Sequence, residues 1–70
     1  MRWQSGDFVT LKYRDESVSA IVLLASNNGR SLLLTFDGML GKHAGAMPVL
    51  MGDDGAFRSV IDNQAVELAP

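Results

Sequence analysis

The stretch VSAIVLLASNNGRSLLLTF, residues 18–36, decides the fold predicted for this 70-residue chain. Residues 18–25 are rich in β-branched side chains and apolar on both faces in their second half, which indicates a strand covered on both sides. Asn28-Gly29 is a strong hairpin signal, because both residues tolerate the positive φ angles that a type I′ turn requires. We therefore predict that residues 31–36, whose even-numbered positions are all apolar, form the next strand and pair antiparallel with residues 18–25.

Three further strands are predicted around this hairpin. Residues 8–13 alternate apolar and polar side chains, and polar or glycine-containing turns precede two later apolar stretches. The complete set of predicted strands is residues 8–13, 18–25, 31–36, 56–61 and 65–68.

The segment from Gly38 to Pro48 is rich in glycine, with further glycines at Gly41 and Gly45. Each interior glycine costs a helix about 1 kcal/mol relative to alanine. The sequence therefore argues against a helix here, and we predict one long structured loop.

These elements define an all-β chain with one domain over residues 1–70. The opening GDFV at residues 6–9, the Asn28-Gly29 hairpin and the ending from Asp62 to Leu68 resemble those of a small SH3-like barrel. The resemblance implies a small barrel, here of five strands with one long glycine-rich loop predicted from the residues, and it implies no particular function. The type II dihydrofolate reductases are similar in length and strand order, but their VQIY pore motif has no counterpart here. An oligomer with an enzymatic pore is kept only as an alternative, as is a binder of single-stranded nucleic acid.

The composition argues against several functional classes. Hydrophobic residues make up 47% of the chain and charged residues 20%, which predicts a folded protein. Six basic against eight acidic residues give a net charge of −2, which disfavours nucleic acid and anionic lipid as partners. The chain has no cysteine for disulfides or thiolate chemistry, and no apolar stretch near the roughly 20 residues of a membrane span. Because the N-terminus also lacks the apolar segment of a signal peptide, we expect a cytoplasmic protein with no membrane partner.

No motif points to catalysis, to a metal or to a cofactor. The Gly41-Lys42 pair does not make a phosphate-binding loop, because Phe36 and His43 occupy the positions that need glycine and Ser or Thr. His43, the only histidine, is predicted to be a solvated loop residue. Asp53-Asp54 lacks the acidic spacing of a calcium loop, and we interpret this pair as turn-forming.

The most informative feature is an excess of apolar side chains along residues 18–34. If Val18, Ala20, Val22 and Leu24 face the interior, then Ile21, Leu23 and Ala25 face outward, and the opposite assignment also leaves an apolar outer face. Small monomers rarely expose a large apolar patch, so either another chain or the loop from Gly38 to Pro48 should cover this face. We favour self-association. The candidate interface is Ile21, Leu23, Leu33, Met39, Leu40 and Met47.

A second hypothesis is a binding site for a small molecule or a peptide. It would lie between the connection from Arg14 to Ser17 and the glycine-rich loop, with Arg14, Lys42 and His43 as its polar contacts. Trp3 is predicted to cover an open end of the barrel, because a chain with so few aromatic residues needs its largest side chain for burial.

Overall fold

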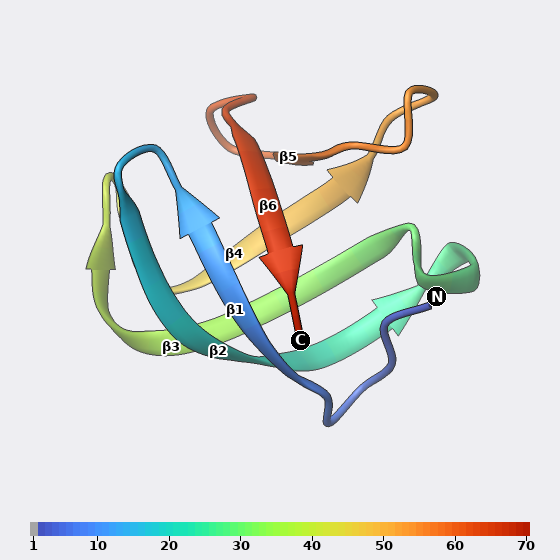
Figure 1. Ribbon diagram of the computed structural model, residues 1–70, viewed down its shortest axis with the longest axis horizontal. Coiled ribbons are helices and arrows are strands. Elements are labelled where there is room, and N and C mark those ends of the chain that lie inside the picture. The colour runs from blue at the N-terminus through green and yellow to red at the C-terminus, as the bar shows by residue number, and fades with distance from the viewer. Residues whose placement is uncertain (1) are drawn as a thin grey trace.

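A computed structural model of the chain describes residues 2–70 as a closed barrel of antiparallel strands (Figure 1). Each strand pairs with the next along the chain, and the last pairs back onto the first. The predicted all-β barrel is confirmed, with six strands in place of five. The strands are β1 Phe8–Tyr13, β2 Glu16–Ser26, β3 Ser31–Leu40, β4 His43–Met51, β5 Phe57–Ser59 and β6 Ala65–Ala69.

The additional strand comes from the segment predicted as a loop. Residues 38–48 belong to the β3–β4 hairpin, so the prediction of a long glycine-rich loop is wrong. Gly38 and Gly45 have φ angles of 89° and 76°, and the β3–β4 register shifts between Thr35 and Met39. These glycines therefore supply the irregular backbone of a bulged hairpin, a role that the helix penalty alone did not reveal.

The hairpin between β2 and β3 is antiparallel, as the Asn-Gly signal predicts. Its connection is longer than a two-residue turn, because Ser26 pairs with Ser31 and a short 3₁₀ turn spans Asn27–Gly29. Asn27, Asn28 and Gly29 all adopt positive φ angles, of 53°, 59° and 83°. Asparagine and glycine are the residues that accept this conformation most readily, which explains why the sequence marks the turn so clearly.

The core lies inside the barrel and is built from alternate residues of every strand. In β1 the inward residues are Val9, Leu11 and Tyr13, as the alternating pattern predicts. Trp3 is half-buried and packs against the core. The buried apolar residues are Val9, Leu11, Tyr13, Ala20, Val22, Leu32, Leu34, Leu40, Met47, Val49, Phe57 and Val66.

A β-bulge in β2 changes which side chains face the core. The register with β3 shifts between Val22 and Leu24, so the inward alternation that includes Ala20 and Val22 does not continue to Leu24. Leu24 is 62% exposed, whereas Ala25 packs against the core. Neither of the two uninterrupted alternations considered for residues 18–25 therefore holds along the whole strand, because a bulge moves every following side chain to the opposite face.

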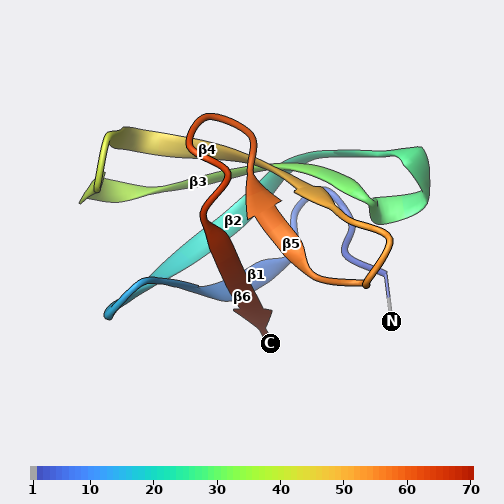
Figure 2. The same ribbon diagram turned by 90° about the horizontal axis from the view of Figure 1, so that it is seen from above.

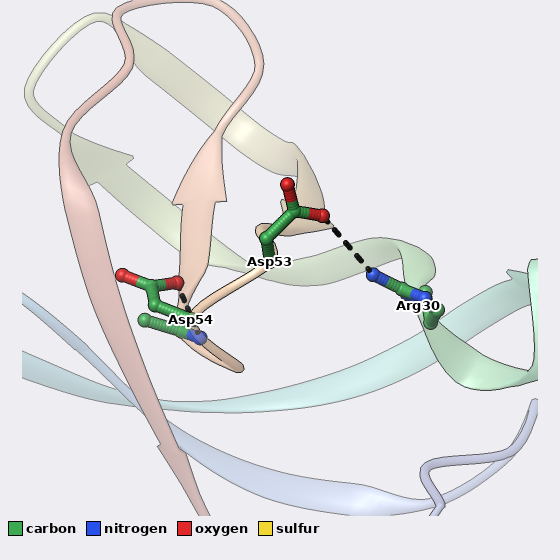
Figure 3. A network of polar contacts seen from close by, with 4 residues as sticks. Arg30, Asp53 and Asp54 are labelled. Atoms are coloured by element: carbon green, nitrogen blue, oxygen red, sulfur yellow. Dashed lines mark hydrogen bonds and ion pairs between the residues drawn. The ribbon is translucent and has the colours of Figure 1, made fainter.

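The turn between β4 and β5 contains the acidic pair of the sequence (Figure 3). Asp54 Oδ1 accepts a hydrogen bond of 3.0 Å from the backbone N–H of Ala56. Asp53 Oδ1 lies 4.0 Å from Arg30 Nη2, an exposed ion pair of little energetic weight. The bond from Ala56 to Asp54 confirms that Asp54 is a turn-forming residue.

Among residues 2–70 no helix has the length and apolar character needed to cross a membrane.

Candidate functional site

Two regions of the barrel carry side chains that the fold alone does not explain. One is the outer apolar surface, which we define as Ile21, Leu23, Leu24, Leu33, Pro48, Leu50 and Val60. The other is the polar cluster, which we define as Tyr13, His43, Ser59 and Asp62.

The outer apolar surface is assembled by strand register. Leu24 of β2 pairs with Leu33 of β3, which in turn pairs with Pro48 of β4. Val60 extends this row, because its backbone N–H donates to the carbonyl of Pro48 at 2.9 Å. The bulge in β2 places Leu23 and Leu24 both on the outside, which doubles the apolar contribution of that strand.

Half of the predicted interface residues belong to this surface. Ile21 and Leu23 are exposed and Leu33 is half-buried on the outer face. Leu40 and Met47 are 1% and 0% exposed, so their assignment to an interface is wrong. Both point into the barrel because the segment that contains them is a hairpin of the wall and not a loop lying over it.

Met39 is exposed, but it lies apart from the outer apolar surface. It pairs with Ala44 near the end of the β3–β4 hairpin, beyond the register shift that follows Thr35. The β3–β4 hairpin forms part of the barrel wall, so it does not fold back over the face of β2 (Figure 1). The hypothesis that residues 38–48 cover the apolar face is therefore wrong.

The first half of the polar cluster joins β1 to the turn after β5. Tyr13 is 1% exposed, and its hydroxyl donates to Asp62 Oδ2 at 2.5 Å. Asp62 Oδ1 also accepts the backbone N–H of Gln64 at 3.1 Å. Because a phenol inside a barrel needs a partner, this contact fixes the turn of residues 60–62 over the barrel end.

The second half of the cluster surrounds His43, which is 3% exposed and not solvated as predicted. Its Nδ1 lies 3.0 Å from the carbonyl of Leu40, and its Nε2 lies 2.8 Å from Ser59 Oγ. A carbonyl only accepts, so Nδ1 carries a proton, and in the neutral ring Nε2 accepts the Ser59 hydroxyl proton. The Tyr13 ring packs edge-on against the imidazole with centroids 5.5 Å apart. Both ring nitrogens are occupied, so His43 has a structural role.

The Tyr13–Asp62 hydrogen bond shifts the pKa values of the two side chains in opposite directions. It lowers the pKa of Asp62 from 3.8 to about 2, because the bond stabilises the carboxylate and outweighs the opposing effect of burial. The same bond raises the pKa of Tyr13 above 10.0, because its acceptor favours the protonated phenol. The pair is therefore a charged acceptor and a neutral donor throughout the neutral range.

The predicted ligand contacts Arg14, Lys42 and His43 lie on segments that meet around Tyr13, but His43 faces the interior. The Arg14 guanidinium carbon lies 5.3 Å from the Tyr13 ring centroid, and Lys42 is exposed in the turn between β3 and β4. A Cβ on Gly41 would lie 2.8 Å from the Tyr13 hydroxyl, so this turn packs closely on the barrel end. His43 points inward from the same hairpin, which removes it as a ligand contact.

Comparisons with protein-family models, with the curated proteins and with the solved structures find no match to this chain. The function is therefore argued from the chain's own residues.

Sequence reasoning missed Asp62 and Ser59 in the cluster, and Leu50 and Val60 on the surface. Tyr13 at an inward position does signal that its hydroxyl needs a partner, but 49 residues separate it from Asp62. Leu50 was missed because most of β4 was not predicted as a strand, so its outward position could not be assigned.

Proposed function

We propose that this chain is a non-enzymatic interaction module, which assembles with further copies of itself through the outer apolar surface. The observation that carries the proposal is the continuous row of Leu24, Leu33, Pro48 and Val60 across four neighbouring segments. Apolar side chains in such a row gain about 25 cal/mol for each Å² removed from water. The row therefore offers a driving force that isolated exposed residues do not.

A second copy is the partner that these observations favour. The surface belongs to relatively rigid, paired strands, so little conformational entropy is lost when two copies dock. None of its seven residues is charged, which permits two identical faces to meet without repulsion. The closed barrel is consistent with the SH3-like barrels that the sequence resembles, and we place the module in the cytoplasm.

Replacing Leu23 and Leu33 together by serine tests the proposal. Both side chains lie on the outer face, so we expect the double variant to keep its strand content and to lose the assembly. The measurements are solution mass by light scattering after size-exclusion chromatography, and far-ultraviolet circular dichroism.

Met39→Ser is the matched control. Met39 is an exposed apolar residue of β3, the strand that contains Leu33, but it lies outside the outer apolar surface. We expect this variant to keep the mass of the native protein. A double variant with an unchanged assembly would contradict the proposal, as would equal dissociation in the Met39 variant.

A further inference from the structure

The wall of the barrel has an open stretch where β2 and β3 run apart (Figure 2). The two strands pair only between Ile21–Ser26 and Ser31–Thr35. Residues 17–20 of β2 pair with β1 on one edge, and within residues 2–70 their other edge has no backbone partner. Residues 36–38 of β3 have no cross-strand partner in this part of the chain either.

The hydrogen-bond pattern identifies which backbone groups face the opening. Val22 exchanges bonds with the segment before β1, since its N–H donates to Asp7 at 2.9 Å and its carbonyl accepts from Gly6 at 2.7 Å. Backbone groups alternate in direction along a strand, so Ser19 and Ser17 direct theirs the opposite way, toward the open edge. Both serines are exposed, so these groups are accessible.

A cavity of about 310 Å³ adjoins this edge. Its apolar contribution comes from Phe8, Ile21 and Phe36, and Asp37 stands at its border. Glu16, at the start of β2 and outside the lining of this cavity, is a second carboxylate on the strand that has the open edge, and neither acid takes part in an ion pair within residues 2–70. The lining residues are Phe8, Ser19, Ala20, Ile21, Thr35, Phe36 and Asp37.

We propose that this open edge binds an extended peptide segment of alternating apolar and basic side chains, which adds as a strand beside residues 17–20 of β2. The open edge of β2 presents an N–H and a C=O group at every second residue. Another extended backbone has the same spacing and can form hydrogen bonds with these groups. Apolar side chains of the added strand contact Phe8 and Phe36, while basic ones approach Glu16 and Asp37. This surface shares Ile21 with the outer apolar surface and is otherwise separate from the Leu23–Leu33 region through which the chain is proposed to self-associate.

The probe is the acetylated and amidated peptide KVKVK, titrated into isotopically labelled protein and followed by amide NMR shifts. We expect shifts at residues 17–20 and 36–38, and binding about tenfold weaker for the acidic counterpart EVEVE. Shifts spread over the whole barrel, or confined to the outer apolar surface, would overturn the proposal, as would an absence of shifts.

Backbone pairing is tested separately with two N-methylated forms of the probe, one methylated at the odd amides and one at the even amides. Only alternate amides of an added strand face its neighbour, so one form should lose binding and the other should keep it. Equal binding of both forms would contradict strand addition. These probes leave the protein unchanged, so the result does not depend on the folding of a variant.

The matched protein variants are Ser19→Pro and Ser19→Ala. Proline removes the N–H that faces the open edge, whereas alanine removes only the hydroxyl, so we expect about a tenfold loss of affinity in the first and none in the second. Circular dichroism checks that both remain folded. Equal affinities in the two folded variants would count against the proposed site, whatever the oligomeric state of the protein.

Discussion

The polar cluster and the outer apolar surface present opposite arrangements in one small barrel. Inside, Tyr13, His43 and Ser59 are buried polar side chains, and their polar atoms are hydrogen-bonded. Outside, Leu24 of β2, Leu33 of β3 and Pro48 of β4 lie in register on the outer face. The comparison teaches that the interior is satisfied by its own hydrogen bonds, whereas the outer face leaves apolar side chains exposed to solvent. We therefore assign the cluster to stability and the surface to association.

The largest effect is expected from His43→Ala. The substitution leaves a cavity and deprives Ser59 of its bond to the imidazole, which together should lower the free energy of unfolding by about 3 kcal/mol. Lys42→Ala is the control, because the neighbouring Lys42 is exposed and should change stability by less than about 0.5 kcal/mol. Urea unfolding measures both. Equal effects would show that the interior cluster is not the stabilising region.

A smaller loss is expected from Tyr13→Phe, which keeps the aromatic ring and removes the hydroxyl bonded to Asp62. The lost charge-assisted hydrogen bond should cost about 2 kcal/mol, because Asp62 then keeps a carboxylate with one partner fewer. Thermal and urea unfolding provide the measurement. An unchanged midpoint would mean that water replaces the phenol at no cost.

Leu24→Ser tests the outer apolar surface, the other region in this comparison. Leu24 is exposed, so the free energy of unfolding of the isolated chain should change by no more than about 0.5 kcal/mol, while self-association weakens. The experiment pairs urea unfolding at the lowest usable concentration with light scattering at high concentration. A large loss of stability without any change in mass would place Leu24 in the interior and contradict the assignment.

Stability is also expected to depend on pH. Asp62 has a folded-state pKa of about 2 against 3.8 for the free group, so the unfolded chain binds more protons between these values. The contribution of Asp62 is thus present above pH 3.8 and is lost as the pH falls toward about 2. Asp62→Asn should flatten this part of the urea-unfolding profile, and an equally steep profile in the variant would refute the assignment to Asp62.

Tyr13, the partner of Asp62, has the opposite effect at high pH, where stability falls as the pH rises. The pKa of Tyr13 is raised above 10.0, so its contribution is present below that pH and is lost as the pH rises through the folded-state value. Tyr13→Phe should remove this alkaline loss. Phenolate absorbance followed during an alkaline titration provides an independent measurement, and ionisation at the ordinary pKa would contradict the buried bond.

Local sequence patterns correctly predicted several strands of the barrel wall, but they did not predict the bulges that interrupt strand pairing. The alternation in residues 8–13 correctly predicts which side of β1 is buried, and Asn28-Gly29 correctly predicts an antiparallel hairpin. The bulge at Leu23 and the kinked hairpin at Gly38 depend on pairing between strands, which a period-two pattern does not contain.

The candidate sites show the same division. Ile21 and Leu23 were predicted to lie outside because their positions alternate with those of buried neighbours. His43 was misassigned because its environment is made by Ser59 and Tyr13, which are distant in sequence and brought together only by barrel closure. Contacts of long sequence separation are the part of the structure that composition and spacing do not supply.

The solution mass of the unmodified protein, measured by light scattering over a hundredfold range of concentration, tests the central claim most directly. If the outer apolar surface associates with further copies, the mass will be a multiple of the chain mass and will fall toward it on dilution. A mass equal to one chain at every concentration would contradict the claim.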